Sequence, residues 1–61
     1  MKKNILERKL KDLGWYLLRQ GGNHEVWTNG EITEPIPRHR EINEILAKKI
    51  IKKAIQNIGK K

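Results

Sequence analysis

The sequence predicts a small α+β domain in the order α-β-β-β-α, with a three-stranded antiparallel sheet and two helices on one face of it. Three observations lead to this prediction. Apolar residues recur with helical spacing at both ends of the chain, three short β-type segments lie between them, and glycine or proline marks the boundaries. Helices gathered on one face of an antiparallel sheet are the usual packing for this order of elements.

The first expected helix covers residues 4–13. Its apolar residues follow the helical repeat at Leu6, Leu10 and Leu13. Asn4 is expected to cap the first turn, with Glu7 reaching back as in a capping box. Gly14 is expected to end the helix, because a residue without Cβ readily takes the left-handed conformation.

Three strands are expected between the helices, at residues 15–20, 24–28 and 31–34. The dipeptide Asn29-Gly30 predicts a tight hairpin, because both residue types tolerate a positive φ. Pro35 and Pro37 follow the third strand. Since proline cannot donate to a β-ladder, this strand is expected to be an edge strand or to end there. The spacing does not decide which face of the sheet meets the helices.

The second expected helix covers residues 43–58, with Asn43 as its N-cap and Gly59 as its stop. On a helical wheel of about 100° per residue, one broad arc is apolar and contains Leu46, Ala47, Ile50, Ile51, Ala54, Ile55 and Ile58. The opposite arc contains Lys48, Lys49, Lys52 and Lys53. The lysine arc is either a solvated face or a surface that holds the backbone of a polyanion.

The composition excludes several classes of protein. A chain of 61 residues is too short for a doubly wound cofactor enzyme, whose βαβ units need about 30 residues each. Cysteine and serine are absent, so disulfides, thiolate zinc sites and cysteine or serine nucleophiles are excluded. We expect one domain over residues 1–61, a cytoplasmic location without a signal sequence or membrane span, and a core that holds Trp15, Tyr16 and Trp27.

The charge points to an anionic partner. Lysine and arginine give a formal net charge of +7 and a pI of about 10.1. A nucleic acid is the leading candidate, because each phosphate that a cation neutralises releases counterions. An anionic membrane surface is the competing candidate. No metal is expected, since two histidines fifteen residues apart without cysteine make a poor ligand set.

The segment Gly21-Gly22-Asn23-His24 is the first candidate for chemistry. Two glycines allow the backbone to come close to a ligand, and Asn23 can hold the turn. Histidine has an unperturbed pKa of about 6.5, so near neutral pH it can both accept and donate a proton. The alternative interpretation is an ordinary hairpin turn with a surface histidine.

The segment Arg38-His39-Arg40 is the second candidate. It follows two prolines, which stiffen the exit from the third strand. Arginine offers a planar fork of donors that matches phosphate oxygens, so these residues could stabilise a phosphate or a transition state. The alternative is a solvated basic loop that leads into the last helix.

Several segments together resemble one known family. They are Leu10-x-x-Leu13-Gly14-Trp15, Arg19-Gln20-Gly21-Gly22-Asn23-His24 and Pro37-x-His39, followed by the amphipathic last helix. In this order, and over nearly the whole chain, they resemble the HicA family of mRNA interferase toxins. The predicted order of elements is also that of double-stranded-RNA-binding domains, which is a similarity of fold alone.

The resemblance implies a fold like that of double-stranded-RNA-binding domains, cleavage of RNA without the ribosome, and neutralisation by a HicB-type antitoxin. It implies that His24 is the catalytic histidine, and it leaves the role of His39 open. We expect metal-independent transesterification without any cofactor, assisted by Arg38 and Arg40. The alternative is a non-catalytic module that binds double-stranded RNA through its shape, which would not need His24.

Overall fold

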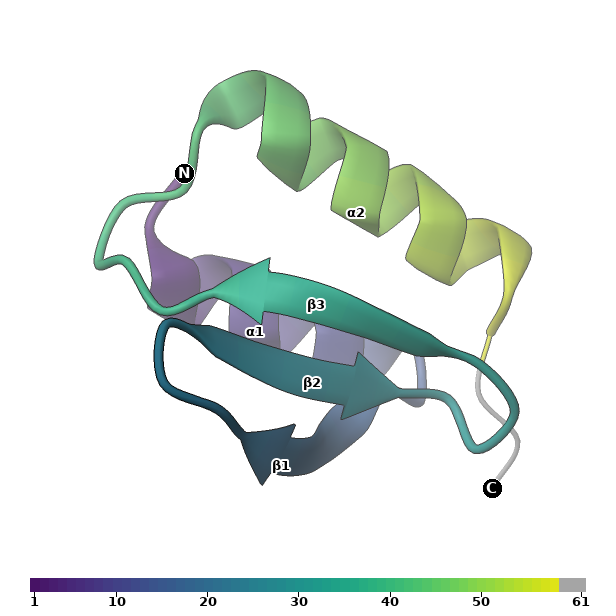
Figure 1. The fold of residues 1–61 in the computed structure, drawn as a ribbon. Coiled ribbons are helices and arrows are strands. Elements are labelled where there is room, and N and C mark those ends of the chain that lie inside the picture. The colour runs from purple at the N-terminus through teal and green to yellow at the C-terminus, as the bar shows by residue number, and fades with distance from the viewer. Residues whose placement is uncertain (59–61) are drawn as a thin grey trace.

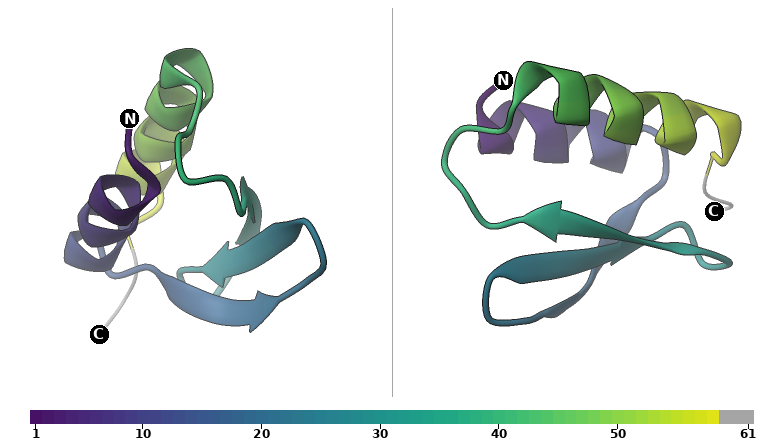
Figure 2. Two further views of the ribbon diagram at one scale, coloured as in Figure 1. Left: turned by 90° about the vertical axis from the view of Figure 1, so that its left-hand side faces the viewer. Right: turned by 45° about the horizontal axis from the view of Figure 1, so that its top comes forward.

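A computed structural model of the protein describes residues 1–58. The elements follow in the order α1 (Lys3–Asp12), β1 (Tyr16–Gln20), β2 (His24–Thr28), β3 (Thr33–Pro37) and α2 (Glu44–Gln56) (Figure 1). The predicted α-β-β-β-α order is therefore confirmed. Figure 2 shows α1 and α2 side by side on one face of the sheet, with the other face uncovered. Neither helix in the described part of the chain has the length and apolar character needed to cross a membrane.

The sheet is antiparallel, with β2 between β1 and β3. Successive side chains of β2 alternate between the two faces. Glu25 and Trp27 are buried, which places them on the face that meets the helices, whereas His24 is exposed. The sequence left the inward face undecided, and the alternation of β2 now identifies it. The β1–β2 pairing is irregular between Leu17 and Arg19.

The third strand covers Thr33–Pro37, so it begins and ends later than predicted and contains both prolines. Pro35 pairs with Val26 and Pro37 pairs with His24. An edge strand tolerates proline where its nitrogen faces away from the neighbouring strand. The prediction of an edge strand is therefore confirmed, and the prediction that the strand covers residues 31–34 is wrong.

The loop between β2 and β3 is longer than the tight hairpin expected from Asn29-Gly30. Of these two residues only Gly30 has a positive φ, of 100°. The side-chain Oδ1 of Asn29 accepts the backbone N–H groups of Glu31 and Ile32, each at 2.8 Å. The asparagine thus orders a four-residue loop through its side chain.

The helix boundaries follow the sequence prediction in part. The Oδ1 of Asn43 accepts the N–H of Ile45 at 2.9 Å and that of Leu46 at 3.3 Å, which confirms this N-cap. At the other helix, Lys2 occupies the N-cap position without a side-chain bond, so the expected capping box of Asn4 and Glu7 is wrong. Glu7 instead binds a lysine.

Glycine ends the first helix as predicted, and the second helix ends earlier than predicted. Gly14 has a φ of 85° directly after the C-cap of α1. The last residue of α2 is Gln56, so the helix stops before the expected Gly59, which lies outside the described residues. The carbonyl of Asn57 accepts the indole N–H of Trp15 at 2.9 Å and the amide of Asn29 at 3.0 Å. These bonds fix the end of α2 to the sheet.

The core lies between the sheet and the two helices and contains Leu6, Leu10, Trp15, Trp27, Ile36, Ile42, Ala47, Ile50 and Ala54. Two of the three aromatic predictions are thus confirmed. Tyr16 is 51% exposed, because its partner in the ladder is Thr28, on the face that no helix covers. The apolar arc of α2 is wider than the stripe that a three-stranded sheet can cover, so Leu46 and Ile55 remain exposed. Ile58 was expected on the same arc, but it lies beyond the end of the helix and is exposed too.

The first residues of the chain pair with the segment that leads into α2. The N–H of Lys3 donates to the carbonyl of Arg40 at 2.9 Å, and the N–H of Ile42 donates to the carbonyl of Met1 at 2.8 Å. Lys2 and Glu41 form an isolated antiparallel bridge between them. This pairing holds the start of α1 against the loop after β3, and so it positions Arg40.

Candidate functional site

An open hollow of about 680 Å³ lies where β2 begins and β3 ends, lined by Gly22, Asn23, His24, Arg38 and His39. The strand register creates it, because His24 pairs with Pro37 across the sheet. The turn before β2 therefore lies beside the segment after β3. The structure brings together most of the residues that the sequence analysis singled out, although they come from two separate segments.

The turn that carries His24 is tightly closed. The N–H of Gly21 donates to the carbonyl of His24 at 2.7 Å. A Cβ at Gly21 would lie only 3.0 Å from that same oxygen, whereas a Cβ at Gly22 would meet no atom within 4 Å. Gly21 is therefore the glycine that the close approach requires. Gly22 leaves open space on the side of the hollow.

Arg38 is fastened to this turn by its main chain and its side chain. Its backbone N–H donates to the carbonyl of Asn23 at 3.1 Å. Its guanidinium Nη1 lies 3.3 Å from the carbonyl oxygens of both Gly21 and Gly22. A guanidinium has five N–H donors, so donors remain for a ligand in the hollow. The structure thus places a fixed cation beside the turn that carries His24.

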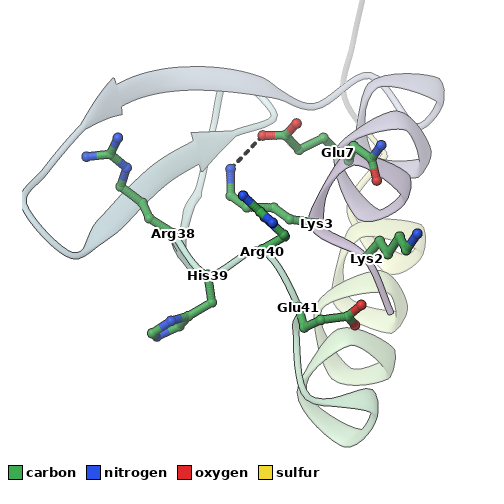
Figure 3. A pocket seen from close by; sticks show the side chains of 8 residues that line it. Lys2, Lys3, Glu7, Arg38, His39, Arg40 and Glu41 are labelled. Atoms are coloured by element: carbon green, nitrogen blue, oxygen red, sulfur yellow. Dashed lines mark hydrogen bonds and ion pairs between the residues drawn. The ribbon is translucent and has the colours of Figure 1, made fainter.

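A buried charged network lies on the helix side of β2, directly behind His24. Glu25 is only 4% exposed, and its Oε1 accepts the Lys3 Nζ at 2.9 Å and the Trp27 Nε1 at 3.0 Å. Lys3 also binds the Oε2 of Glu7 at 2.7 Å (Figure 3). Within the described residues, every buried side-chain nitrogen and oxygen has a hydrogen-bond partner.

The network shifts the pKa of both its central groups toward their charged forms. Burial alone would raise the pKa of the Glu25 carboxyl, but the hydrogen bonds from Lys3 and Trp27 and the charges of Lys3 and Arg38 lower it overall. Burial alone would lower the pKa of the Lys3 ammonium, but its bonds to Glu7 and Glu25 raise it overall. Both groups are therefore held in the ionised state.

Arg40 lies in a second, neighbouring hollow. This open hollow of about 570 Å³ is lined by Lys2, Lys3, Asn4, Glu7, Arg38, His39, Arg40 and Glu41. It shares Arg38 and His39 with the hollow that contains His24. In Figure 3 the side chains of His39 and Arg40 point in different directions, with Arg40 directed toward Lys3. Arg40 was predicted to act together with Arg38, but it lines only the second hollow and not the one that contains His24.

The lysine face of α2 lines neither hollow. Lys48, Lys49 and Lys52 are exposed, and Lys53 forms an ion pair with Glu34 of β3 at 2.5 Å. The structure therefore does not bring these lysines to His24. Any contact that they make with RNA is separate from the hollow.

Three residues near the site were not predicted from the sequence to belong to it: Lys3, Asn4 and Glu25. One signal for Glu25 was present, because it alternates with Trp27 in a strand and so shares its face. If the tryptophan is buried, the carboxylate is buried too and needs a cation. Nothing in the sequence indicated that Lys3 is this cation. The described residues contain no group of three or more histidine, aspartate and glutamate side chains that could hold a metal ion.

We expect Glu25→Gln to destabilise the fold by about 2 kcal/mol at neutral pH, because a hydrogen bond to a charged group is typically worth about 1.5–3 kcal/mol. The matched control is Glu34→Gln, which breaks a more exposed ion pair and is expected to cost less than about 1 kcal/mol. Urea unfolding measures both changes.

The same pair of variants has a pH dependence with a defined sign. A lowered pKa in the folded state gives stability that is present above the ordinary glutamate pKa of about 4.3 and is lost as the pH falls through the folded value. The difference between wild type and Glu25→Gln should therefore shrink between pH 6 and pH 3. A difference that stays constant over this range would contradict the prediction.

Comparison with known proteins gives a match to a family. Residues 4–55 match the model of a family described as HicA toxin of bacterial toxin-antitoxin. The matched part includes both helices almost completely, the whole sheet and the hollow that contains His24. The second hollow is matched except for Lys2 and Lys3. No curated protein and no solved structure matches the chain.

Proposed function

The chain belongs to the HicA family of toxins from bacterial toxin–antitoxin systems, and we propose that it is an endoribonuclease that cleaves RNA without the ribosome and without a metal. The observation that carries this proposal is the hollow in which His24, His39 and Arg38 lie together. Both imidazoles are exposed, so both are available to a substrate. Two proton-transfer groups beside a fixed cation are what phosphodiester transesterification needs from a protein.

The reaction uses a nucleophile that the RNA itself supplies. The ribose 2′-oxygen attacks the neighbouring phosphorus, the bond from phosphorus to the 5′-oxygen breaks, and the products carry a 2′,3′-cyclic phosphate and a 5′-hydroxyl. His24 accepts the proton of the 2′-hydroxyl. Acid–base assistance of this kind contributes typically about 10²–10⁴-fold to the rate. The absence of serine and cysteine from the chain is no obstacle to this mechanism.

The departing 5′-oxygen needs a proton, and we assign its delivery to His39. This residue lines the same hollow as His24 but belongs to another segment. Two separate histidines allow one to act as base while the other acts as acid in the same turnover. With a single histidine, both transfers would depend on the same ring.

Arg38 supplies the positive charge. A pentacoordinate phosphorus carries more negative charge than the diester, so a donor already in place stabilises the transition state more than the substrate. The bonds of Arg38 to the Gly21 and Gly22 carbonyls hold its guanidinium in position. Gly22 and Asn23 form the rim of the hollow, and the exposed lysines of α2 add a positive surface for phosphates without reading bases.

The first prediction from this proposal is cleavage of RNA in excess EDTA. Wild-type protein should produce 2′,3′-cyclic phosphate ends, and His24→Ala should lower the rate by about 10²–10⁴-fold while RNA affinity changes little. Gel assays and end-group analysis measure the cleavage, and fluorescence anisotropy measures the affinity. Activity that is lost in EDTA and restored by a divalent metal would refute the mechanism. Binding without any cleavage by the wild type would favour the RNA-binding module instead.

A second prediction separates the two histidines through the leaving group. A nucleoside 3′-(p-nitrophenyl phosphate) has a leaving group that departs without a proton. On this substrate His39→Ala should retain nearly the full rate, whereas His24→Ala should remain strongly impaired. On a natural phosphodiester both variants should be impaired. Equal losses for His39→Ala on both substrates would exclude it as the general acid.

Membership of a toxin–antitoxin family implies an antitoxin partner. We propose that this partner is a HicB-type protein with an acidic surface that covers the His24 hollow. The net charge of +7 favours fast, salt-sensitive association with such a surface. Expression of the wild type alone should arrest growth, and expression of His24→Ala should not. Growth arrest by both the wild type and His24→Ala would show that toxicity does not depend on the proposed chemistry.

A further inference from the structure

We propose that the hollow beside the first turn of α1 is a second substrate position, which binds the phosphodiester next to the one being cleaved, with Arg40 as its main contact. This inference rests on the proposed ribonuclease function and deepens it. It states that the preferred substrate has at least two consecutive phosphodiesters. It also separates the roles of Arg38 and Arg40, which the sequence could not distinguish.

The charges that line this hollow leave an excess of cations. Its two acidic residues are each close to a positive group: Glu7 binds Lys3 at 2.7 Å, and Glu41 lies 3.8 Å from the Met1 amino group. Glu25, which lies behind the hollow, also forms an ion pair with Lys3. Arg38 and Arg40 form no ion pair with any described residue. Lys3 is shared by two carboxylates, and so is the Met1 amino group, so these pairs do not neutralise every carboxylate. The lining nevertheless carries four cationic side chains against two carboxylates. An anion in this hollow would therefore meet a net positive charge and two guanidinium groups that form no ion pair.

Arg40 has a fixed main chain and an available side chain. Its carbonyl accepts the N–H of Lys3 at 2.9 Å, which ties its backbone to the start of α1. Its guanidinium has no hydrogen bond or ion pair to a described residue, and Figure 3 shows it directed toward Lys3. The planar fork of a guanidinium matches two phosphate oxygens.

The two hollows are adjacent and share a wall formed by Arg38 and His39. Arg38 and Arg40 are two residues apart, so their Cα atoms are separated by at most about 7 Å. Such a separation suits neighbouring phosphates of one strand. A strand whose scissile phosphate lies at His24 and Arg38 therefore reaches Arg40 with the next phosphate.

Asn4 gives the second hollow a polar group besides its charges. The sequence analysis expected this side chain to cap α1, but the helix begins one residue earlier and leaves the N-cap without a side-chain bond. Asn4 is exposed and lines the hollow. Its amide can donate to and accept from a ribose or a base edge, which a bare phosphate site would not need.

The test compares substrates with one phosphodiester and with three. A dinucleotide and a tetranucleotide that contain the same central step are cleaved by wild type, Arg40→Gln and the matched control Arg8→Gln, an exposed arginine of α1 that lines neither hollow. Arg40→Gln should lower kcat/KM about tenfold on the tetranucleotide, mainly through KM, and leave the dinucleotide unchanged. Loss of a contact made equally in substrate and transition state has this signature. Arg8→Gln should change neither substrate.

Two results would overturn the inference. An equal loss on the dinucleotide would mean that Arg40 acts at the scissile phosphate. A loss on the tetranucleotide no larger than that of Arg8→Gln would mean that no second position exists. Thermal unfolding checks the fold of Arg40→Gln, which should match the wild type because the structural bond of Arg40 uses its backbone carbonyl.

A binding experiment keeps this inference separate from the proposed catalysis. A 2′-O-methyl tetranucleotide lacks the nucleophile, so its affinity can be measured by fluorescence anisotropy without cleavage. The slope of log affinity against log salt should fall in magnitude by about 0.7 in Arg40→Gln, as expected for one single-strand phosphate contact, and should not change in Arg8→Gln. If the wild type cleaves nothing but this difference is present, the second position stands and the ribonuclease proposal fails. Equal slopes for the two variants would refute the second position.

Discussion

The buried ion pair between Lys3 and Glu25 is the interaction on which the arrangement of this protein depends. It joins the first turn of α1 to the central strand. Taking two charges out of water is costly, and their attraction compensates only when further hydrogen bonds satisfy them. Glu7 and Trp27 supply those bonds. Because neighbouring residues of a strand face opposite sides, the anchored Glu25 fixes the backbone that presents His24 to solvent.

The same end of the molecule is closed a second time by backbone pairing. The first residues of the chain pair with residues 40–42, so the loop after β3 is held along much of its length. The walls of the two hollows therefore come from three segments: the turn before β2, the loop after β3 and the start of α1. Loops positioned in this way by a rigid scaffold commonly carry functional residues.

The sequence predicted those features that depend on local chemistry. The bounds of β2, the N-cap at Asn43 and the helix stop at Gly14 follow from alternation, a capping side chain and a missing Cβ, and all three are present. The grouping of His24 with Arg38 and His39 followed from residue chemistry and from the family resemblance. The structure brings these residues into one hollow.

The errors concern features that depend on what lies next to each element. The third strand was expected over residues 31–34, but as an edge strand it tolerates Pro35 and Pro37 and extends through both. Tyr16 was expected in the core because it is large and aromatic, yet its face of the sheet has no cover. Asn4 could cap a helix by its chemistry, but Lys3 pairs with Arg40, and the helix begins at Lys3, one residue nearer the N-terminus than predicted. Neither burial nor register at these positions can be derived from local spacing.

The two prolines of β3 have a further consequence for how this sheet can associate with other chains. Proline nitrogens carry no hydrogen, so the free edge of β3 lacks donors at Pro35 and Pro37. The free edge of β1 contains no proline. Addition of a strand from another chain is therefore favoured at the free edge of β1, and a strand added there would run next to the turn that leads into His24.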